Sequence, residues 1–250
     1  MSESEVGIPP VLAAAWGLRE RSGKGPRPGL TLDRIVAAGV KVAASEGLGA
    51  VSMARVASEL GAATMSLYRY VKAKDDLLDL MVDAAIGQPE PRPPGEDWRA
   101  GLTRFARTYL ALLRRQPWVV RVSISSPPIT PNQIAWMNHG LEIMRDTTLA
   151  HHERLSAIMI ISGLTRNWAL LTADIDAAAR GGGVSTEQAM AGYARLLKLL
   201  ADPARFPAIG ELIASGTLDD PAEVPDDDFE FGIARFLDGL EAHMTRQQER

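Results

Sequence analysis

The 250-residue chain contains no cysteine, which excludes a disulfide framework, thiolate chemistry and a cysteine-ligated metal site. It also lacks strand-like alternation between hairpin turns, whereas apolar residues recur at helical spacing along nearly the whole sequence. No apolar run reaches the roughly 18 uncharged residues of a membrane span, and the N-terminus, MSESEVGIPP, carries acids where a signal peptide needs a positive flank. These absences predict an all-α protein of the cytoplasm without a membrane segment.

Groups of residues typical of enzymes are also missing. The sequence has no nucleophile motif and no Gly-rich phosphate loop. The neighbours His151 and His152, followed by Glu153, point to different faces of a helix and have no third ligand four residues on. We therefore expect no catalytic residue, no metal ligand and no cofactor. An all-α enzyme or a small-molecule carrier without DNA function stays as the alternative class.

Charge is unevenly distributed along the chain. The net charge is −4, but residues 19–74 hold ten Lys or Arg against four Asp or Glu, a net of +6. Residues 75–250 carry a net of −8. A basic face on an otherwise acidic body is typical of a protein that binds nucleic acid with one surface.

Two short helices joined by a glycine turn are predicted inside this basic segment. Ser52 is a capping residue at the start of the first helix, and Gly61 can adopt the positive φ that ends it. The second helix is expected over residues 64–71, held to the core by Leu67 and Val71. A helix-turn-helix of this kind places its second helix in the major groove of DNA.

The outer side of the second helix supplies the candidate DNA contacts. Those expected at base edges or nearby backbone are Thr64, Met65, Ser66, Tyr68 and Arg69, and those expected at phosphates are Tyr70 and Lys74. A bidentate contact from Arg69 to guanine would add about 1–3 kcal/mol of discrimination, whereas Lys74 would add affinity without sequence preference. Two alternatives stay open, namely Tyr68 as a packing residue and Arg69 as a phosphate contact.

Residues 60–77, LGAATMSLYRYVKAKDDL, resemble the TetR-type transcriptional regulators, whose first domain commonly reads L-G-V-x-x-x-[ST]-L-Y-x-H-[FV]-x-x-K-x-x-L. The chain departs from that pattern at Ala62 in place of Val, Tyr70 in place of His, and Ala73 in place of a capping Ser or Asn. Ala73 is expected to weaken the cap of the next helix by about 1 kcal/mol. The resemblance extends over residues 31–86 and implies a ligand-responsive transcriptional regulator. Such a protein is a repressor that binds a palindromic operator as a homodimer and is released by a small-molecule effector.

Glycine- and proline-rich stretches predict three parts. Residues 31–87 form a three-helix head with a connecting helix, and the first helix is expected from a Thr31 cap to Glu46. Residues 97–250 follow the proline-rich segment 87–97. Residues 1–30 form an extension with one short helix over 9–20 and a basic arm. The arm residues, expected along phosphates or in a minor groove, are Arg19, Arg21, Lys24 and Arg27. The alternative for this extension is a flexible leader.

Residues 97–250 are similar to the C-terminal domain of the tetracycline-repressor branch, which implies a helical ligand-binding and dimerisation domain. Helices are expected over 97–116, 131–146, 151–178, 185–202 and 229–246. The resemblance implies that the last two pair with those of a second copy, and both carry wide apolar stripes. The alternative is that both stripes face the core of their own chain.

The effector pocket is the least defined prediction. Candidate pocket residues are Phe105, Tyr109, Trp136, Met137, His139, Met144, Met159, Asn167 and Trp168. Large residues at helical spacing are also typical of plain core, so each has that alternative. A largely apolar effector is expected because such cavities use few polar groups to orient a guest.

Overall fold

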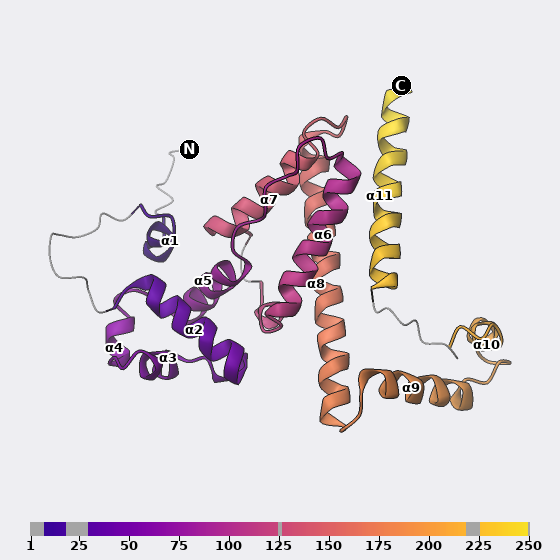
Figure 1. Cartoon of the computed structure of the whole chain (residues 1–250), viewed down its shortest axis with the longest axis horizontal. Helices are drawn as coiled ribbons and strands as arrows, with labels where there is room; N and C mark the ends of the chain where they lie inside the picture. Colours follow the sequence, from indigo (N-terminus) through magenta and orange to yellow (C-terminus); the bar gives the residue numbers. More distant parts are fainter. Residues whose placement is uncertain (1–7, 19–29, 125–126, 219–225, 250) are drawn as a thin grey trace, which may run out of the picture. The chain divides into compact units, whose positions relative to one another are not determined.

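The structure is a computed structural model that describes residues 8–18, 30–124, 127–218 and 226–249. Within these ranges it contains helices and no strand, so the all-α prediction is confirmed (Figure 1). The chain divides into two compact units, Met1–Ile160 and Ile161–Arg250. This division falls inside one long helix, whereas the proline-rich segment 87–97 lies within the first unit.

The head belongs to the first unit and is made of four helices and one short 3-10 turn. These are α2 (Leu32–Glu46), η1 (Leu48–Ala50), α3 (Met53–Glu59), α4 (Thr64–Leu67) and α5 (Lys74–Ile86). Helix α2 packs against α3 and α5, and α3 packs against α4. The fully buried apolar side chains of the head are Ile35, Val42, Val56, Leu67, Val71, Leu77 and Met81. These residues hold the two short helices against α2, although neither is long enough to be stable alone.

The predicted starts of the first two head helices are confirmed. The Thr31 hydroxyl accepts a hydrogen bond from the Arg34 N–H at 3.2 Å, and the Ser52 hydroxyl accepts one from the Arg55 N–H at 3.1 Å. Each bond satisfies an N–H group that has no partner inside its helix. Gly61 has φ +61°, as the sharp turn after α3 requires.

The second helix of the pair is shorter than predicted. Helix α4 ends at Leu67, not at Val71, and continues as a turn in which the N–H groups of Tyr70 and Val71 both donate to the Leu67 carbonyl, at 2.9 and 3.0 Å. The Tyr70 hydroxyl donates to the Leu30 carbonyl at 2.8 Å and so fixes the turn to the residues before α2. Leu67 and Val71 are both fully buried, so the predicted core register is right and only the helix end is wrong.

The rest of the first unit contains α1 (Pro10–Ala15), α6 (Trp98–Arg115), η2 (Val119–Arg121), α7 (Pro131–Ile143) and the start of α8 (His151–Gly181). The Asp97 carboxylate caps α6 by accepting the Ala100 N–H at 2.8 Å. Helix α7 packs against both α5 and α6, so it joins the head to the following helices. In the N-terminal extension, directly after α1, the Trp16 indole N–H donates to the Ile129 carbonyl at 2.9 Å, just before α7.

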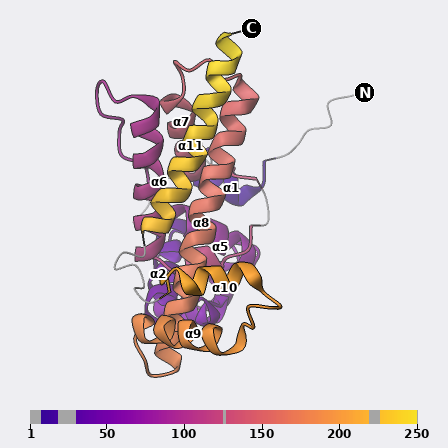
Figure 2. The ribbon, with the colours of Figure 1, turned by 90° about the vertical axis from the view of Figure 1, so that its right-hand side faces the viewer.

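The second unit holds the end of α8 together with α9 (Thr186–Leu200), α10 (Pro207–Ala214) and α11 (Asp227–Gln248). Figures 1 and 2 show the start of α11 next to this part of α8, where the rings of Phe229 and Trp168 are 6.4 Å apart. Helix α10 was not predicted. Its signal was a proline at the first helical position followed by apolar residues three and four apart, in a stretch rich enough in Pro and Gly to suggest a connection.

Candidate DNA-binding head and effector region

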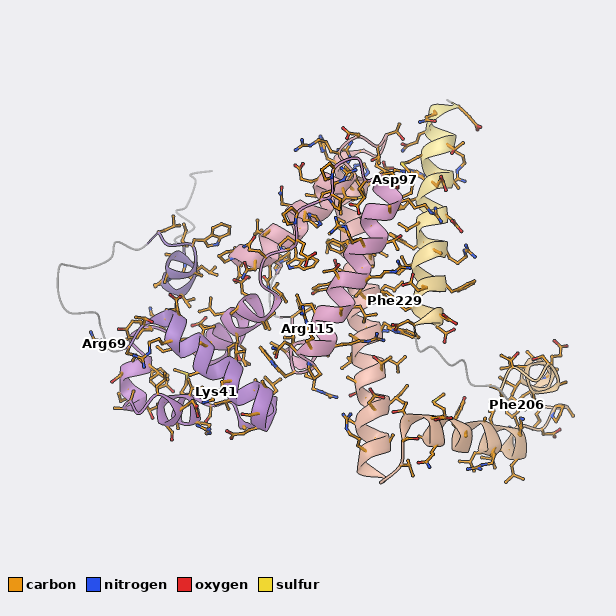
Figure 3. All side chains as sticks on the ribbon, in the orientation of Figure 1. Lys41, Arg69, Asp97, Arg115, Phe206 and Phe229 are labelled. Carbon is orange, nitrogen blue, oxygen red and sulfur yellow. The ribbon has the colours of Figure 1, made fainter. Side chains whose placement is uncertain are left out.

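The predicted recognition segment presents its side chains at one edge of the head. Met65 is 74% exposed and Tyr68 is 42% exposed, so Tyr68 is not a core residue. Arg69 is exposed at the edge of the head next to α4, and Thr64 and Ser66 are half-buried (Figure 3). The structure therefore brings all five predicted base-contact residues into one turn of helix and the turn that follows it.

The predicted phosphate contacts differ from one another. Lys74 is exposed at the first position of α5. Tyr70 is half-buried, and its hydroxyl proton is already engaged by the Leu30 carbonyl. Lys72 is also exposed beside Lys74, although it was not among the predicted contacts. Its signal was simply its charge inside the basic segment.

Two other cations of the head, Arg55 and Lys41, are held in ion pairs. Arg55 lies 2.6 Å from Glu46 and 2.9 Å from Glu59, and Lys41 lies 2.5 Å from Glu59. The hydrogen bond from Arg55 lowers the pKa of Glu46, and the bonds from Lys41 and then Arg55 lower the pKa of Glu59.

The cations at the edge are left out of this network. Within residues 30–124, Arg69, Lys72 and Lys74 take no part in the ion pairs that hold the head together. Their charge is therefore not neutralised by a neighbouring carboxylate in those pairs. The predicted arm residues Arg19, Arg21, Lys24 and Arg27 lie outside the described residues.

An aromatic cluster forms between α6 and α7. The ring of Phe105 is 5.3 Å from Trp136 and 6.3 Å from both Tyr109 and His139, and Tyr109 is 5.2 Å from Trp136. His139 stacks on Phe105 with an interplanar angle of 19°. Four of the predicted pocket residues thus come together, and such ring pairs contribute about 0.5–1.5 kcal/mol each beyond their burial.

A charged pair lies beside this aromatic cluster. The Arg104 guanidinium makes two bonds to the Glu96 carboxylate, at 2.7 and 2.9 Å, and these lower the pKa of Glu96. Burial, and then the positive charge of Arg104, lower the pKa of His139, so its imidazole is neutral near pH 7. Among the described residues, no three His, Asp or Glu side chains are grouped to hold a metal ion.

The remaining pocket candidates differ in exposure. Met144 is fully buried and Met137 is half-buried, whereas Met159 is 63% exposed on α8 and Asn167 is exposed further along it. Trp168 belongs to the second unit, where it contacts Phe229, and its buried indole N–H has no hydrogen-bond partner among the described residues. Four of the nine predicted pocket residues therefore meet in the aromatic cluster, and the other five stay predictions.

A buried acid of α5, Asp83, was missed by the sequence analysis. Its carboxylate accepts the backbone N–H groups of Asn132 at 2.8 Å and of Gln133 at 3.1 Å, at the start of α7. An acid among the apolar residues of a helix was the only available signal, because its partners lie about fifty residues away in the sequence.

Comparison with known families gives two matches that follow one another along the chain. Residues 35–81 match the family described as "Bacterial regulatory proteins, tetR family", and residues 90–244 match "Tetracyclin repressor-like, C-terminal domain". The first match covers most of the head and the second covers the helices from α6 to α11.

Individual relatives agree with these matches. The chain is 38% identical, over 95% of its length and 87% of the relative's, to the HTH-type transcriptional repressor DrrR1 of Streptomyces coeruleorubidus. It is similar to the TetR family protein ActR of Streptomyces coelicolor in complex with actinorhodin, with a TM-score of 0.71 and 27% identity over 88% of this chain and 98% of that one. TetR from Acinetobacter baumannii AYE, at 17% identity over 86% of this chain and 98% of that one and a TM-score of 0.58, shares the fold. The chain belongs to the TetR family of bacterial regulatory proteins and is a ligand-responsive, DNA-binding transcriptional regulator of the repressor type.

Proposed function

We propose that the turn formed by α4 and residues 68–74 reads the operator. The observation that carries this proposal is the exposed edge where Arg69, Lys72 and Lys74 stand outside the ion pairs of the head. Thr64, Met65, Ser66, Tyr68 and Arg69 are proposed at base edges or adjacent backbone, and Tyr70 and Lys74 at phosphates. Arg69 presents the planar guanidinium that suits guanine, whereas Lys74 is a point charge suited to phosphate. For Tyr70, a phosphate contact would share or replace its bond to Leu30.

We propose the same function for each of the three parts of the chain as the sequence predicts. Residues 31–87 act as the DNA-binding domain and residues 97–250 as the ligand-binding and dimerisation domain. Residues 1–30 add a basic arm whose cations lie along the phosphates. We propose that the protein regulates transcription without catalysing a reaction and that it acts in the bacterial cytoplasm.

The effector is proposed to be a largely apolar molecule with planar aromatic rings. It would lie against the cluster of Phe105, Tyr109, Trp136 and His139, which offers ring faces and edges together with one neutral imidazole. The similar protein ActR is known in complexes with actinorhodin and with (S)-DNPA. These two compounds are therefore sensible first probes for this chain.

The homodimer is proposed to use residues 185–202 and 229–246. On α9 the apolar residues Tyr193, Leu196 and Leu200 are exposed and have no cover in the single chain. On α11, by contrast, Phe229 and Ile233 are buried in the single chain, which leaves only part of its stripe for a partner. The burial on α11 agrees in part with the alternative that this stripe faces its own core.

Helix α8 supplies a further exposed apolar row for the same dimer. Leu155, Met159 and Ile160 are exposed at positions four and five residues apart and form a short row near the start of the helix. By length and composition this helix is apolar enough to cross a membrane, yet only 28% of its most apolar stretch is buried in the chain. A second copy packed on this row would remove it from water, and we therefore add it to the proposed interface.

The test of the proposed DNA contacts compares operator binding by three variants. DNA from upstream of the protein's own coding region is titrated with wild type, Arg69→Ala, Lys74→Ala and the control Arg115→Ala, an exposed cation at the end of α6. Lys74→Ala should weaken binding evenly across operator sequences. It should also reduce, by about one, the slope of the logarithm of the binding constant against the logarithm of salt concentration. Arg69→Ala should cost about 1–3 kcal/mol and relax specificity at a single base pair. Arg115→Ala should leave both unchanged.

Base-selective loss in Lys74→Ala, or uniform loss in Arg69→Ala, would contradict the assigned roles. If the upstream fragment binds no better than a scrambled competitor, a genome-wide selection of fragments replaces it. Failure of both would overturn the proposed operator contacts and favour the carrier alternative.

A further inference from the structure

Helix α7 is capped by another helix instead of by its own residues. Its capping position is occupied by Thr130, whose buried hydroxyl makes no hydrogen bond among the described residues. The first free N–H groups of α7, from Asn132 and Gln133, are accepted by the Asp83 carboxylate at 2.8 and 3.1 Å. Asp83 lies on α5 and is only 7% exposed, so this is a buried, charge-assisted cap at the positive end of the helix dipole.

Two more contacts join the same pair of helices. The Asn132 side-chain amide donates to the Asp83 carbonyl at 2.8 Å. One turn further along α7, the Trp136 indole N–H donates to the carbonyl of Gly87 at 3.0 Å. Gly87 is the residue that ends α5. The end of α5 is therefore bonded to the start of α7 at both backbone and side-chain groups.

Trp136 takes part in the aromatic cluster as well as in this joint. Its ring lies 5.3 Å from Phe105 and 5.2 Å from Tyr109, while its N–H is bonded to Gly87. A ligand ring that packs against the cluster and moves the indole must therefore stretch or break the bond to α5. Because Asp83 holds the same helix from α5, a shift of α7 is passed to α5, whose first residue is Lys74.

We propose that Asp83 and Trp136 are positioning residues that couple effector binding to the DNA-binding head. The inference rests on the proposed effector site and deepens it, by naming the contacts that carry the signal. Coupling between two sites is reciprocal: if the effector changes operator affinity through the joint, operator binding changes effector affinity by the same factor and must also act on the joint. This reciprocity allows a test without the natural effector.

The experiment measures hydrogen exchange at the backbone amides of Asn132 and Gln133, with and without the operator fragment recovered above. In the wild type we expect DNA to change their exchange rates at least about fivefold, the lower end of ordinary allosteric coupling. Asp83→Ala removes the acceptor, and Trp136→Phe keeps a ring but removes the N–H. In both variants the ratio of the exchange rates with and without DNA should approach one. Asp83→Asn keeps an acceptor oxygen and should restore part of the response.

Two control variants lose the same kinds of bond elsewhere. Asp97→Ala removes a carboxylate that caps its own helix α6, and Trp118→Phe removes an indole N–H that is bonded to the Gln116 side chain. A purely structural role for the joint predicts lower stability in all four disruptive variants and an unchanged DNA response in each. The coupling role predicts a lost response only in Asp83→Ala and Trp136→Phe.

The outcomes separate this inference from the proposed function. If wild-type protein binds no operator, the proposed operator contacts fail before the joint is tested, and actinorhodin or (S)-DNPA replaces DNA as the probe of the same two amides. If operator binds and the two amides exchange at unchanged rates, or if Trp136→Phe keeps the full response, the joint is not the coupling element.

Discussion

At the scale of single residues, burial fixes the charge of His139. Burial and the neighbouring Arg104 lower the pKa of His139 below its ordinary 6.5, so the folded protein holds fewer protons there than the unfolded chain does. The free energy of unfolding therefore falls as the pH drops below 6.5 and levels off below the folded pKa. We expect His139→Gln to remove this part of the pH dependence.

The measurement is urea unfolding of wild type and variant at several pH values between neutral and mildly acidic. His152→Gln, at an exposed position at the start of α8, is the matched control because it removes a histidine that is not part of the aromatic cluster. The prediction is contradicted if the free energy of unfolding, plotted against pH, runs parallel for wild type and His139→Gln across this range.

Residue roles that depend on near neighbours were predictable from the sequence. Thr31 and Ser52 cap helices that begin at the next residue, and Gly61 adopts the positive φ that the turn after α3 requires. The partner of Asp83 was not predictable, since it lies 49 and 50 positions away and has no signature in the sequence. The hydrogen bond from the Tyr70 hydroxyl to the Leu30 carbonyl was not predictable for the same reason, because it joins residues 40 positions apart.

At the scale of an element, α5 has an incomplete cap. Ala73 occupies the capping position with φ −135° and ψ 161°, and its N–H donates to the Asp76 carboxylate at 3.2 Å. A hydroxyl at position 73 would accept an N–H in return and complete the reciprocal arrangement. Ala73→Ser should therefore raise the free energy of unfolding by about 0.5–2 kcal/mol.

Thermal and urea unfolding check this value against Ala84→Ser, an exposed substitution in the interior of α5. That control gains no cap and should lose up to about 0.7 kcal/mol through helix propensity. Equal effects in the two variants would show that the start of α5 is not limited by its cap.

Helix existence followed from periodicity, but helix ends and one short helix did not. The long amphipathic helices α2, α6 and α8 lie close to their predicted ranges because many residues contribute to each pattern. Helix α4 is only four residues long, so its end depends on tertiary contacts of the next turn. Helix α10 has eight residues and begins with a proline, in a stretch whose sequence resembles a connection.

At the scale of the whole molecule, the charge segregation, the fold class and the family were all accessible from the sequence. Of the predicted pocket residues, four meet in the aromatic cluster, which follows from their helical spacing, whereas the roles of Met159 and Asn167, exposed on α8, stay predictions. The surface that a second copy would cover was not accessible from the sequence. A single sequence shows the same apolar stripe whether that stripe faces its own core or a second copy. In the single chain the two stripes differ, because Phe229 on α11 is buried and Leu196 on α9 is exposed.

The dimer proposal predicts that charge placed on either exposed apolar row will dissociate the protein. Met159→Glu on α8 and Leu196→Glu on α9 would each bury a carboxylate against apolar neighbours of a second copy, which is costly without a partner. Ile124→Glu, at an exposed apolar residue outside both helices, is the matched control. Light scattering across a dilution series should show weaker association in the first two variants and unchanged association in the control.

Operator binding should fall with the dimer, because a palindromic site engages two heads related by a two-fold axis. The head itself should stay folded in these variants, since neither position belongs to its core. If Met159→Glu yields monomers while Leu196→Glu remains dimeric, residues 185–202 lie outside the interface and α8 takes their place. If both remain dimeric and bind operator normally, neither row is the surface that a second copy covers.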